Sequence, residues 1–318
     1  MKGAEYTLYG LTVLYFICLC CMYKNIRVSI QVLKTASVII MGNIRMLFVP
    51  FFEAILLLAW SAFWITSFGY LLSSGEITQP KHGSQLKKIE LSDDQKWMAY
   101  GHVFTFFWGF ELIQALFTFS LIVGVCTWYF TSHEDSRGSF SLSTGFWWAF
   151  RYNLGSLALG SFILAVVWII RVIFEYIDKQ MEGAKQNNAV VRAISYCVRC
   201  CLDCFHRFIK FLNENAYCQV ALTGENFCTS AMAAFVLALK NAATFFITNG
   251  IGALIQFLGR VTVSIANTLI GYLIITYVPE FVEDIDSPVP VLLVIFFISF
   301  TMATVFMEVY SSTSLAIL

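Results

Sequence analysis

Long uncharged runs constrain this chain more than any other feature of its sequence. Residues 289–307 contain no Asp, Glu, Lys or Arg, and residues 97–130 contain a single one, Glu111. A helix of about 20 apolar residues matches the hydrocarbon core of a bilayer. Charged residues make up 13% of the 318 residues, whereas soluble domains carry about 25%. We therefore expect an all-α fold, a polytopic transmembrane helical bundle.

Apolar runs predict six spans, and a seventh depends on whether residues 216–240 cross. The predicted spans cover residues 6–23, 47–72, 97–130, 150–177, 251–278 and 289–307. Residues 24–46 join the first two and have apolar residues at helical spacing. We expect this connector to be an amphipathic helix at the membrane surface, on the cytoplasmic side that its basic residues favour. Residues 1–318 are expected to form a single transmembrane domain.

Residues 178–215 form a basic, cysteine-rich connector whose side of the membrane is left open. A single crossing by residues 150–177 places the connector outside, whereas its lysines and arginines favour the cytoplasm. Its cysteines lie at spacings that share one helical face: Cys197, Cys200, Cys201 and Cys204. Juxtamembrane cysteines among basic residues are typical of palmitoylation, with plain packing toward the membrane as the alternative. Thiols along one stripe do not close a tetrahedron, so no metal site is expected.

An ionisable residue inside a span indicates a functional site, because it is costly in a bilayer without a partner or water. Glu111 is such a residue, and Trp108, Gln114 and Thr118 lie near it on roughly one face of the same predicted helix. A carboxylate beside an aromatic ring suits a quaternary ammonium ligand, since both attract the cation. The same carboxylate could take up a proton. The alternative is a structural role for Glu111 between helices, with Trp108 only filling space.

Small and polar residues in two other spans are further candidates for packing or for lining a substrate path. Gly155, Ser156 and Gly160 give residues 150–177 a small-residue face that permits close helix packing. Asn267 could hydrogen-bond across helices.

The chain lacks the motifs of several enzyme classes. It has no GxxxxGK[ST] loop, so we do not expect this chain to drive transport with ATP. It has neither HExxH nor GxSxG, and its four histidines show no metal-ligand spacing. The net charge is zero without a basic tail, so nucleic acid is not an expected partner. We expect a protein that is not an enzyme and has no cofactor.

Residues 213–235, NENAYCQVALTGENFCTSAMAAF, are too polar for an ordinary span and too apolar for a free loop. They closely resemble a signature of the choline transporter-like family, an N-x-N-A-Y stretch followed by a G-x-x-F-C-x-S-A segment. The matching residues are Asn213, Asn215, Ala216, Tyr217, Gly224, Phe227, Cys228, Ser230 and Ala231. CVRCCLDCFHRFIKFLN and RYNLGSLALGSFILAVVWIIRVIFEYID are also similar to the family, in the same order along the chain.

The resemblance implies an ATP-independent helical carrier of choline, and in some members of ethanolamine, that exchanges its substrate with protons. It implies early spans and a large extracellular loop that this chain lacks, so the chain matches the C-terminal part of a longer protein. It also implies the plasma membrane, with mitochondrial or other organelle membranes as further locations. A non-transporting membrane scaffold or partial isoform, and an amine-permeable channel, remain alternatives. The oligomeric state is left open.

Overall fold

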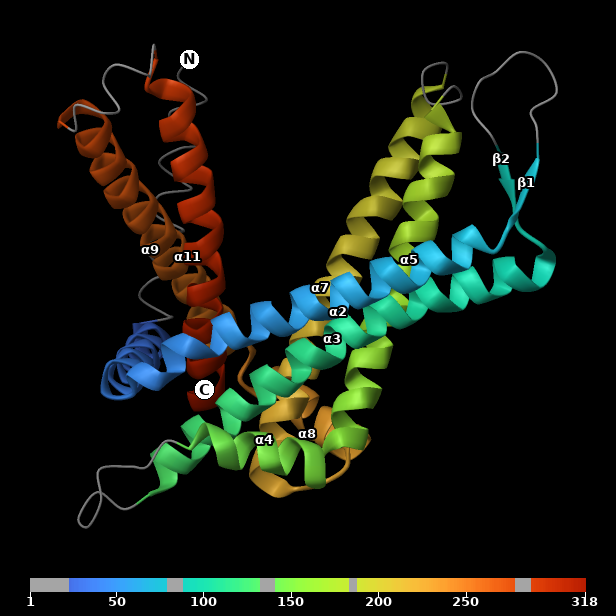
Figure 1. The fold of residues 1–318 in the computed structure, drawn as a ribbon. Coiled ribbons are helices and arrows are strands. Elements are labelled where there is room, and N and C mark those ends of the chain that lie inside the picture. The colour runs from blue at the N-terminus through green and yellow to red at the C-terminus, as the bar shows by residue number, and fades with distance from the viewer. Residues whose placement is uncertain (1–22, 79–87, 132–140, 183–187, 278–286) are drawn as a thin grey trace, which may run out of the picture. The chain divides into compact units, whose positions relative to one another are not determined.

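The computed structural model describes residues 23–78, 88–131, 141–182, 188–277 and 287–318. These residues are mostly helical, which confirms the predicted all-α class (Figure 1). The long helices are α2 (Val49–Ser73), α3 (Asp93–Phe130), α5 (Leu154–Gln180), α7 (Ala189–Thr223), α9 (Ala242–Tyr277) and α11 (Val289–Ile317). The shorter ones are η1 (Ile44–Phe48), α4 (Leu142–Arg151), α8 (Phe227–Lys240) and a helix over residues 23–42. Strands β1 (Glu76–Thr78) and β2 (Lys88–Glu90) pair as an antiparallel hairpin in which Ile77 faces Ile89.

Several of the described helices are long and apolar enough to cross a bilayer. Judged by length and composition, these are η1 with α2, then α3, α5, α9 and α11. The consecutive helices α7 and α8 qualify only as a pair, and they meet at an angle of 111°. The five single spans agree with the predicted ones, whereas the span predicted at residues 6–23 lies outside the described residues.

The chain packs as two compact units, each built from segments that are separate in sequence. The first unit comprises the described residues within 1–50, 125–140 and 235–318, and the second those within 51–124 and 141–234.

Helices α9 and α11 of the first unit lie side by side (Figure 1). Gly271 permits this approach, since a Cβ atom added there would lie 2.8 Å from the side chain of Ile295. Asn267 donates a hydrogen bond to Ser299 across the same pair, at 3.3 Å between Nδ2 and Oγ. The two helices therefore associate through a small residue and a polar contact, as helices in membranes commonly do.

The helix over residues 23–42 packs on the same pair through one stripe. Ser29 and Thr248 share a buried hydrogen bond of 2.7 Å between their hydroxyl oxygens. The hydroxyl of Tyr310 donates to the carbonyl oxygen of Leu33 at 3.2 Å. Met41, on the remainder of the helix, is 81% exposed. The helix therefore has one side packed on α9 and α11 and another side that is exposed, in keeping with its predicted amphipathic character. Its position at the membrane surface stays a prediction.

In the second unit, tryptophans of α2 bind the backbone of α3, which lies alongside it (Figure 1). The indole nitrogen of Trp64 donates to the carbonyl oxygen of His102 at 2.8 Å, and that of Trp60 donates to the carbonyl oxygen of Phe106 at 3.2 Å. The imidazole of His102 stacks on the ring of Trp64, with 5.2 Å between ring centroids. These contacts leave α3 fixed along one side while its other side faces α5.

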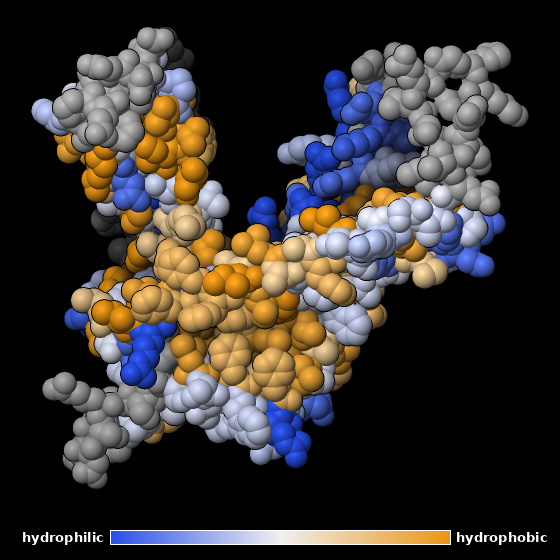
Figure 2. Space-filling view, in the orientation of Figure 1, coloured by the Kyte–Doolittle hydropathy of each residue, from blue (hydrophilic) through white to orange (hydrophobic). Residues whose placement is uncertain are grey.

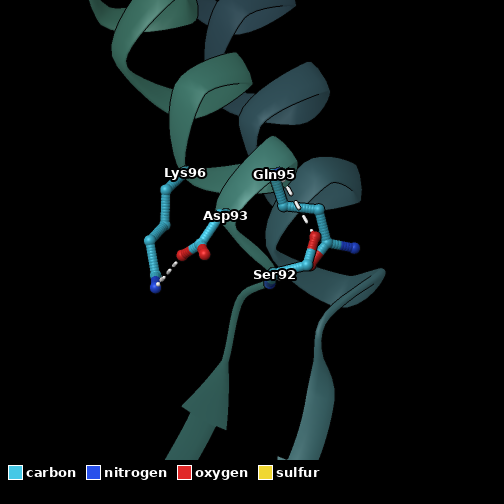
Figure 3. Close-up of polar contacts among 4 residues, drawn as sticks. All are labelled: Ser92, Asp93, Gln95 and Lys96. Atoms are coloured by element: carbon cyan, nitrogen blue, oxygen red, sulfur yellow. Dashed lines mark hydrogen bonds and ion pairs between the residues drawn. The ribbon is translucent and has the colours of Figure 1, made fainter.

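Helix α3 begins at Asp93, earlier than the predicted Trp97, because a capping box ends the preceding loop (Figure 3). The backbone nitrogen of Gln95 donates to Ser92 Oγ at 3.3 Å, and the backbone nitrogen of Ser92 donates to Gln95 Oε1 at 2.9 Å. This reciprocal pair satisfies two amides at the start of the helix. Lys96 adds an exposed ion pair with Asp93 at 2.8 Å.

Candidate functional site

Helices α5 and α7 form an antiparallel pair (Figure 1). Four contacts set their register: Asp178 with Ser195, Arg171 with Asp203, Trp168 with His206, and Gly160 with Asn213. From Gly160 to Asp178, α5 rises about 27 Å, close to the roughly 30 Å thickness of the hydrocarbon core. Much of residues 178–215, predicted as a connector, is thus helix α7 running back along α5.

This register places charged side chains of α7 beside an uncharged part of α5. Residues 152–170 contain no Asp, Glu, Lys or Arg. Beside them α7 carries His206, Lys210 and Glu214, and Lys210 pairs with Glu214 at 3.7 Å. Beyond Arg171, both helices become polar, and hydrophilic side chains gather over their ends (Figure 2). Ionisable residues at membrane depth commonly mark the path of a substrate or an ion.

Glu111 of α3 faces this part of α5 and α7. Its Oε1 accepts a hydrogen bond of 2.8 Å from the indole nitrogen of Trp168. The ring of Trp168 stacks on Phe107, with 5.9 Å between centroids, and meets the imidazole of His206 edge-on at 5.0 Å. The carboxylate is therefore oriented by one indole that is itself contacted by Phe107, His206 and the guanidinium of Arg171.

Counted formally, with Glu111 ionised and His206 neutral, this group carries one negative charge. The guanidinium of Arg171, 5.4 Å from the centroid of the Trp168 ring, is itself paired with Asp203. Lys210 and Glu214 balance each other at neutral pH, and the carboxylate of Glu111 remains. Trp168 contributes a neutral donor, which orients that carboxylate without neutralising it. We call Glu111, Trp168, His206, Lys210 and Glu214 the polar cluster. Its charge suits a small monovalent cation.

Trp108, predicted beside Glu111, contacts a different part of α5. Its indole nitrogen donates to the carbonyl oxygen of Ala158 at 3.1 Å, and its ring meets that of Phe162 edge-on at 5.8 Å. These contacts tie α3 to α5. The ligand contacts predicted for Trp108, and for the half-buried Gln114 and Thr118, stay predictions.

Asn213 and Tyr217 of the NENAY stretch pack against Gly160. Asn213 Nδ2 donates to the carbonyl oxygen of Gly160 at 2.7 Å. The hydroxyl of Tyr217 lies against the Cα side of Gly160, and a Cβ atom added there would also lie 2.9 Å from the ring of Phe227. The Tyr217 hydroxyl is buried and has no hydrogen-bond partner among the described residues, as is also true of Ser230 Oγ. Buried polar groups without partners are rare.

The remainder of the stretch turns the chain between α7 and α8. Gly224 adopts φ +71°, and its backbone nitrogen caps α7 by donating to the carbonyl oxygen of Val220 at 2.9 Å. Asn226 then begins α8 by accepting a hydrogen bond from the backbone nitrogen of Thr229 at 3.0 Å. With 14 residues, α8 is about 21 Å long, too short to cross a bilayer alone. The stretch is therefore a helical elbow, which explains its mixed polarity.

A sequence profile of the family described as plasma-membrane choline transporter matches residues 6–318. This chain belongs to the choline transporter-like family. It is 31% identical to choline transporter-like protein 2 of Dictyostelium discoideum over 93% of its own length and 46% of that protein. It is 29% identical to choline transporter-like protein 1 of Rattus norvegicus over 94% of its own length and 44% of that protein. The chain thus spans less than half the length of these curated relatives.

Membership in the choline transporter-like family, together with the apolar helices, makes the chain part of an integral membrane protein of a plasma-membrane family. The family resemblance inferred from the NENAY stretch is therefore confirmed.

The other candidate residues of this family member have different surroundings. Gly160 lies at a helix contact, whereas a Cβ atom added at Gly155 would meet nothing within 4 Å. Ser156 is half-buried, and Asn267 binds Ser299 within the first unit. The cysteines on α7 are free and exposed: Cys197, Cys200, Cys201 and Cys204. No group of three or more His, Cys, Asp or Glu side chains among the described residues could hold a metal ion.

Sequence reasoning missed four members of the polar cluster. Lys210 and Glu214 belong to the segment that the sequence predicts as a connector, and no local signal places them beside a membrane span. Trp168 and His206 carry no local signal, because only the register of α5 and α7 brings them together. The acidic residue within a span was the single signal available, and it identified Glu111.

Proposed function

We propose that the protein to which this chain belongs carries choline, or a related small amine such as ethanolamine, across the membrane without ATP hydrolysis. One observation supports this most directly: a carboxylate in a membrane helix, Glu111, is oriented by Trp168 within a cluster of net charge −1. An alkylammonium ion is a monovalent cation with apolar substituents. It suits a carboxylate that lies beside an aromatic ring. The family membership agrees with this substrate class.

In this proposal, Glu111 neutralises the ammonium group and the rings around Trp168 contact its carbon atoms. The Trp168 indole keeps the carboxylate in one orientation through its hydrogen bond. Glu111 would also be the residue that takes up a proton when no amine is bound, which gives exchange of amine for proton. Trp108 supports the site from the neighbouring turn of α3 through its bond to Ala158.

The decisive experiment is uptake of radiolabelled choline by cells or proteoliposomes that contain the whole protein. We expect saturable uptake that is lost by about tenfold or more in Glu111→Gln, since a hydrogen bond or contact to a charged group contributes about 1.5–3 kcal/mol. Glutamine keeps the size of the side chain and an acceptor for Trp168, so the fold should be preserved. Glu182→Gln, at an exposed glutamate two residues after the end of α5, is the matched control and should leave uptake unchanged.

Trp168→Phe tests the same site by removing the indole donor and keeping an aromatic ring. We expect the apparent KM for choline to rise, because the carboxylate loses its fixed orientation. Trp97→Phe, at a 75% exposed tryptophan of α3, is the control. Uptake unchanged in both Glu111→Gln and Trp168→Phe would move the substrate site elsewhere.

Two other functions predict different outcomes of this assay. A channel would give uptake that does not saturate and no exchange of labelled for unlabelled substrate. A membrane scaffold would reach the membrane and give no uptake of choline or of ethanolamine.

A further inference from the structure

The cysteine face of α7 points away from α5. The residues of α7 that contact α5 are Ser195, Asp203, His206, Asn213 and Tyr217, spaced as one side of a helix. Cys197, Cys200, Cys201 and Cys204 lie outside that side, and all four are free and exposed. Their thiols are therefore accessible on the outer face of the pair.

The register of α5 and α7 fixes the depth of these thiols relative to the apolar part of α5. Arg171 is the first charged residue after the uncharged residues 152–170, so it marks the end of the part of α5 that can lie in hydrocarbon. Arg171 Nη2 contacts Asp203 Oδ1 at 2.9 Å. Cys204, the next residue after Asp203, is thus level with this boundary. Cys197 is seven positions earlier, so the other thiols lie within about 10 Å beyond the boundary.

The same face carries apolar side chains that are partly exposed. Ile194 is 58% exposed, Phe205 is 49% exposed and Phe208 is 45% exposed. Arg207 is also exposed on this helix, whereas Arg199 pairs with Asp178 of α5 at 3.5 Å. An apolar stripe beside an arginine suits the interface of a leaflet with anionic lipids. The thiols therefore lie where an attached acyl chain could enter the bilayer directly.

We propose that Cys197, Cys200, Cys201 and Cys204 are S-acylated and that acyl chains anchor α7 to the cytoplasmic leaflet. In the reaction a cysteine thiol gives up its proton and its sulfur attacks the carbonyl carbon of a long-chain acyl-coenzyme A. The new thioester bond forms, the bond to the coenzyme sulfur breaks, and coenzyme A leaves as the thiol. Lysines and arginines flank this end of α5 and α7, which favours the cytoplasmic side where the acyl donor is found. Three candidate spans, α2, α3 and α5, separate this end from residues 24–46. The proposal therefore places residues 24–46 on the opposite side of the membrane from the one expected from their basic residues.

Acyl–polymer exchange on the whole protein expressed in cells tests this proposal without measuring transport. Free thiols are first blocked, thioesters are then cleaved with hydroxylamine, and each released thiol is labelled with a maleimide polymer. We expect bands shifted by up to four polymer increments, one for each of these cysteines, only after hydroxylamine. Replacing all four cysteines with serine should abolish the shift. Cys228→Ser, at an exposed cysteine of α8, is the matched control and should retain it.

A single substitution tests the proposal even if the variant with all four substitutions misfolds. Cys201→Ser should remove one increment at an unchanged level of protein in the membrane. A wild-type protein without a hydroxylamine-dependent shift would overturn the proposal, whether the thiols prove free or protected by a metal. A shift that survives in the fourfold variant would overturn it as well.

Discussion

Gly160 is the residue of α5 against which Tyr217 and Phe227 both pack. We expect Gly160→Ala to lower the free energy of unfolding by about 1–3 kcal/mol, because the added Cβ atom overlaps both side chains. The measurement is thermal unfolding of the purified protein in detergent. Gly155→Ala, on the same helix, adds a methyl group to open space, so its stability should stay equal or rise slightly with the better helix propensity of alanine. Equal losses in both variants would contradict the packing argument.

The hydroxyl of Tyr217 is buried without a hydrogen-bond partner among the described residues. Tyr217→Phe should therefore leave the free energy of unfolding unchanged or raise it by about 1 kcal/mol, since an unsatisfied buried group is removed. Tyr310→Phe is the opposite case, because the hydroxyl of Tyr310 donates to the carbonyl oxygen of Leu33. That variant should lose about 0.5–1.5 kcal/mol. A loss of stability in Tyr217→Phe as large as in Tyr310→Phe would show that the Tyr217 hydroxyl has a partner.

Among single residues, sequence reasoning found Glu111 because a carboxylate within an apolar run is conspicuous. It assigned Trp108 as the aromatic partner from spacing along one helix. In the folded chain the indole that binds the carboxylate comes from α5, at Trp168. A partner on another helix depends on how the helices pack, and spacing along α3 carries no information about that.

At the scale of elements, the elbow between α7 and α8 depends on one backbone conformation. Gly224 has φ +71°, a region that costs other residues about 1–2 kcal/mol. We expect Gly224→Ala to destabilise the protein by about that amount and to loosen the elbow, measured as faster amide hydrogen exchange in α8. Gly250→Ala in α9 is the control, because that glycine is helical and has open space around its Cα. Unchanged exchange in Gly224→Ala would mean that contacts elsewhere hold α8.

The helices themselves were largely predictable, since uncharged runs of this length have few alternatives to a span. The residues at which the helices begin and end were less predictable. Helix α9 begins at Ala242 instead of residue 251, and contacts of its first part, such as Thr248 with Ser29, explain the extension. Helix α11 continues to Ile317 past polar residues, because hydroxyls such as that of Thr313 bond to carbonyl oxygens of the preceding turn.

At the scale of the whole molecule, the proposed carrier function and the position of Glu111 lead to one expectation about energy coupling. Uptake by proteoliposomes should need no ATP, and an imposed pH gradient should change its rate. Glu111→Gln should make the residual uptake insensitive to that gradient, because glutamine does not take up a proton. Uptake that requires ATP, or a full response to the gradient in the variant, would contradict this coupling.

The position of residues 178–215 depends on contacts between helices, which the sequence does not contain. Basic residues and cysteines predict a connector over residues 178–215, and its position relative to the bilayer stays a prediction. The later part follows the uncharged half of α5 and carries Lys210 and Glu214 to that depth. The register of α7 against α5 is set by contacts between the two helices, such as the hydrogen bond from Asn213 to the carbonyl oxygen of Gly160.

The sequence alone determined the class of fold, the family and the acidic residue at the candidate site, because each depends on composition or on residues close together in the chain. Long uncharged runs require helices that satisfy their own backbone in a bilayer. Only the tertiary structure decided which side chains surround Glu111, that α7 returns along α5, and that the NENAY stretch is an elbow packed on Gly160. These features depend on the register between helices, and register is set by contacts between residues that are far apart in sequence.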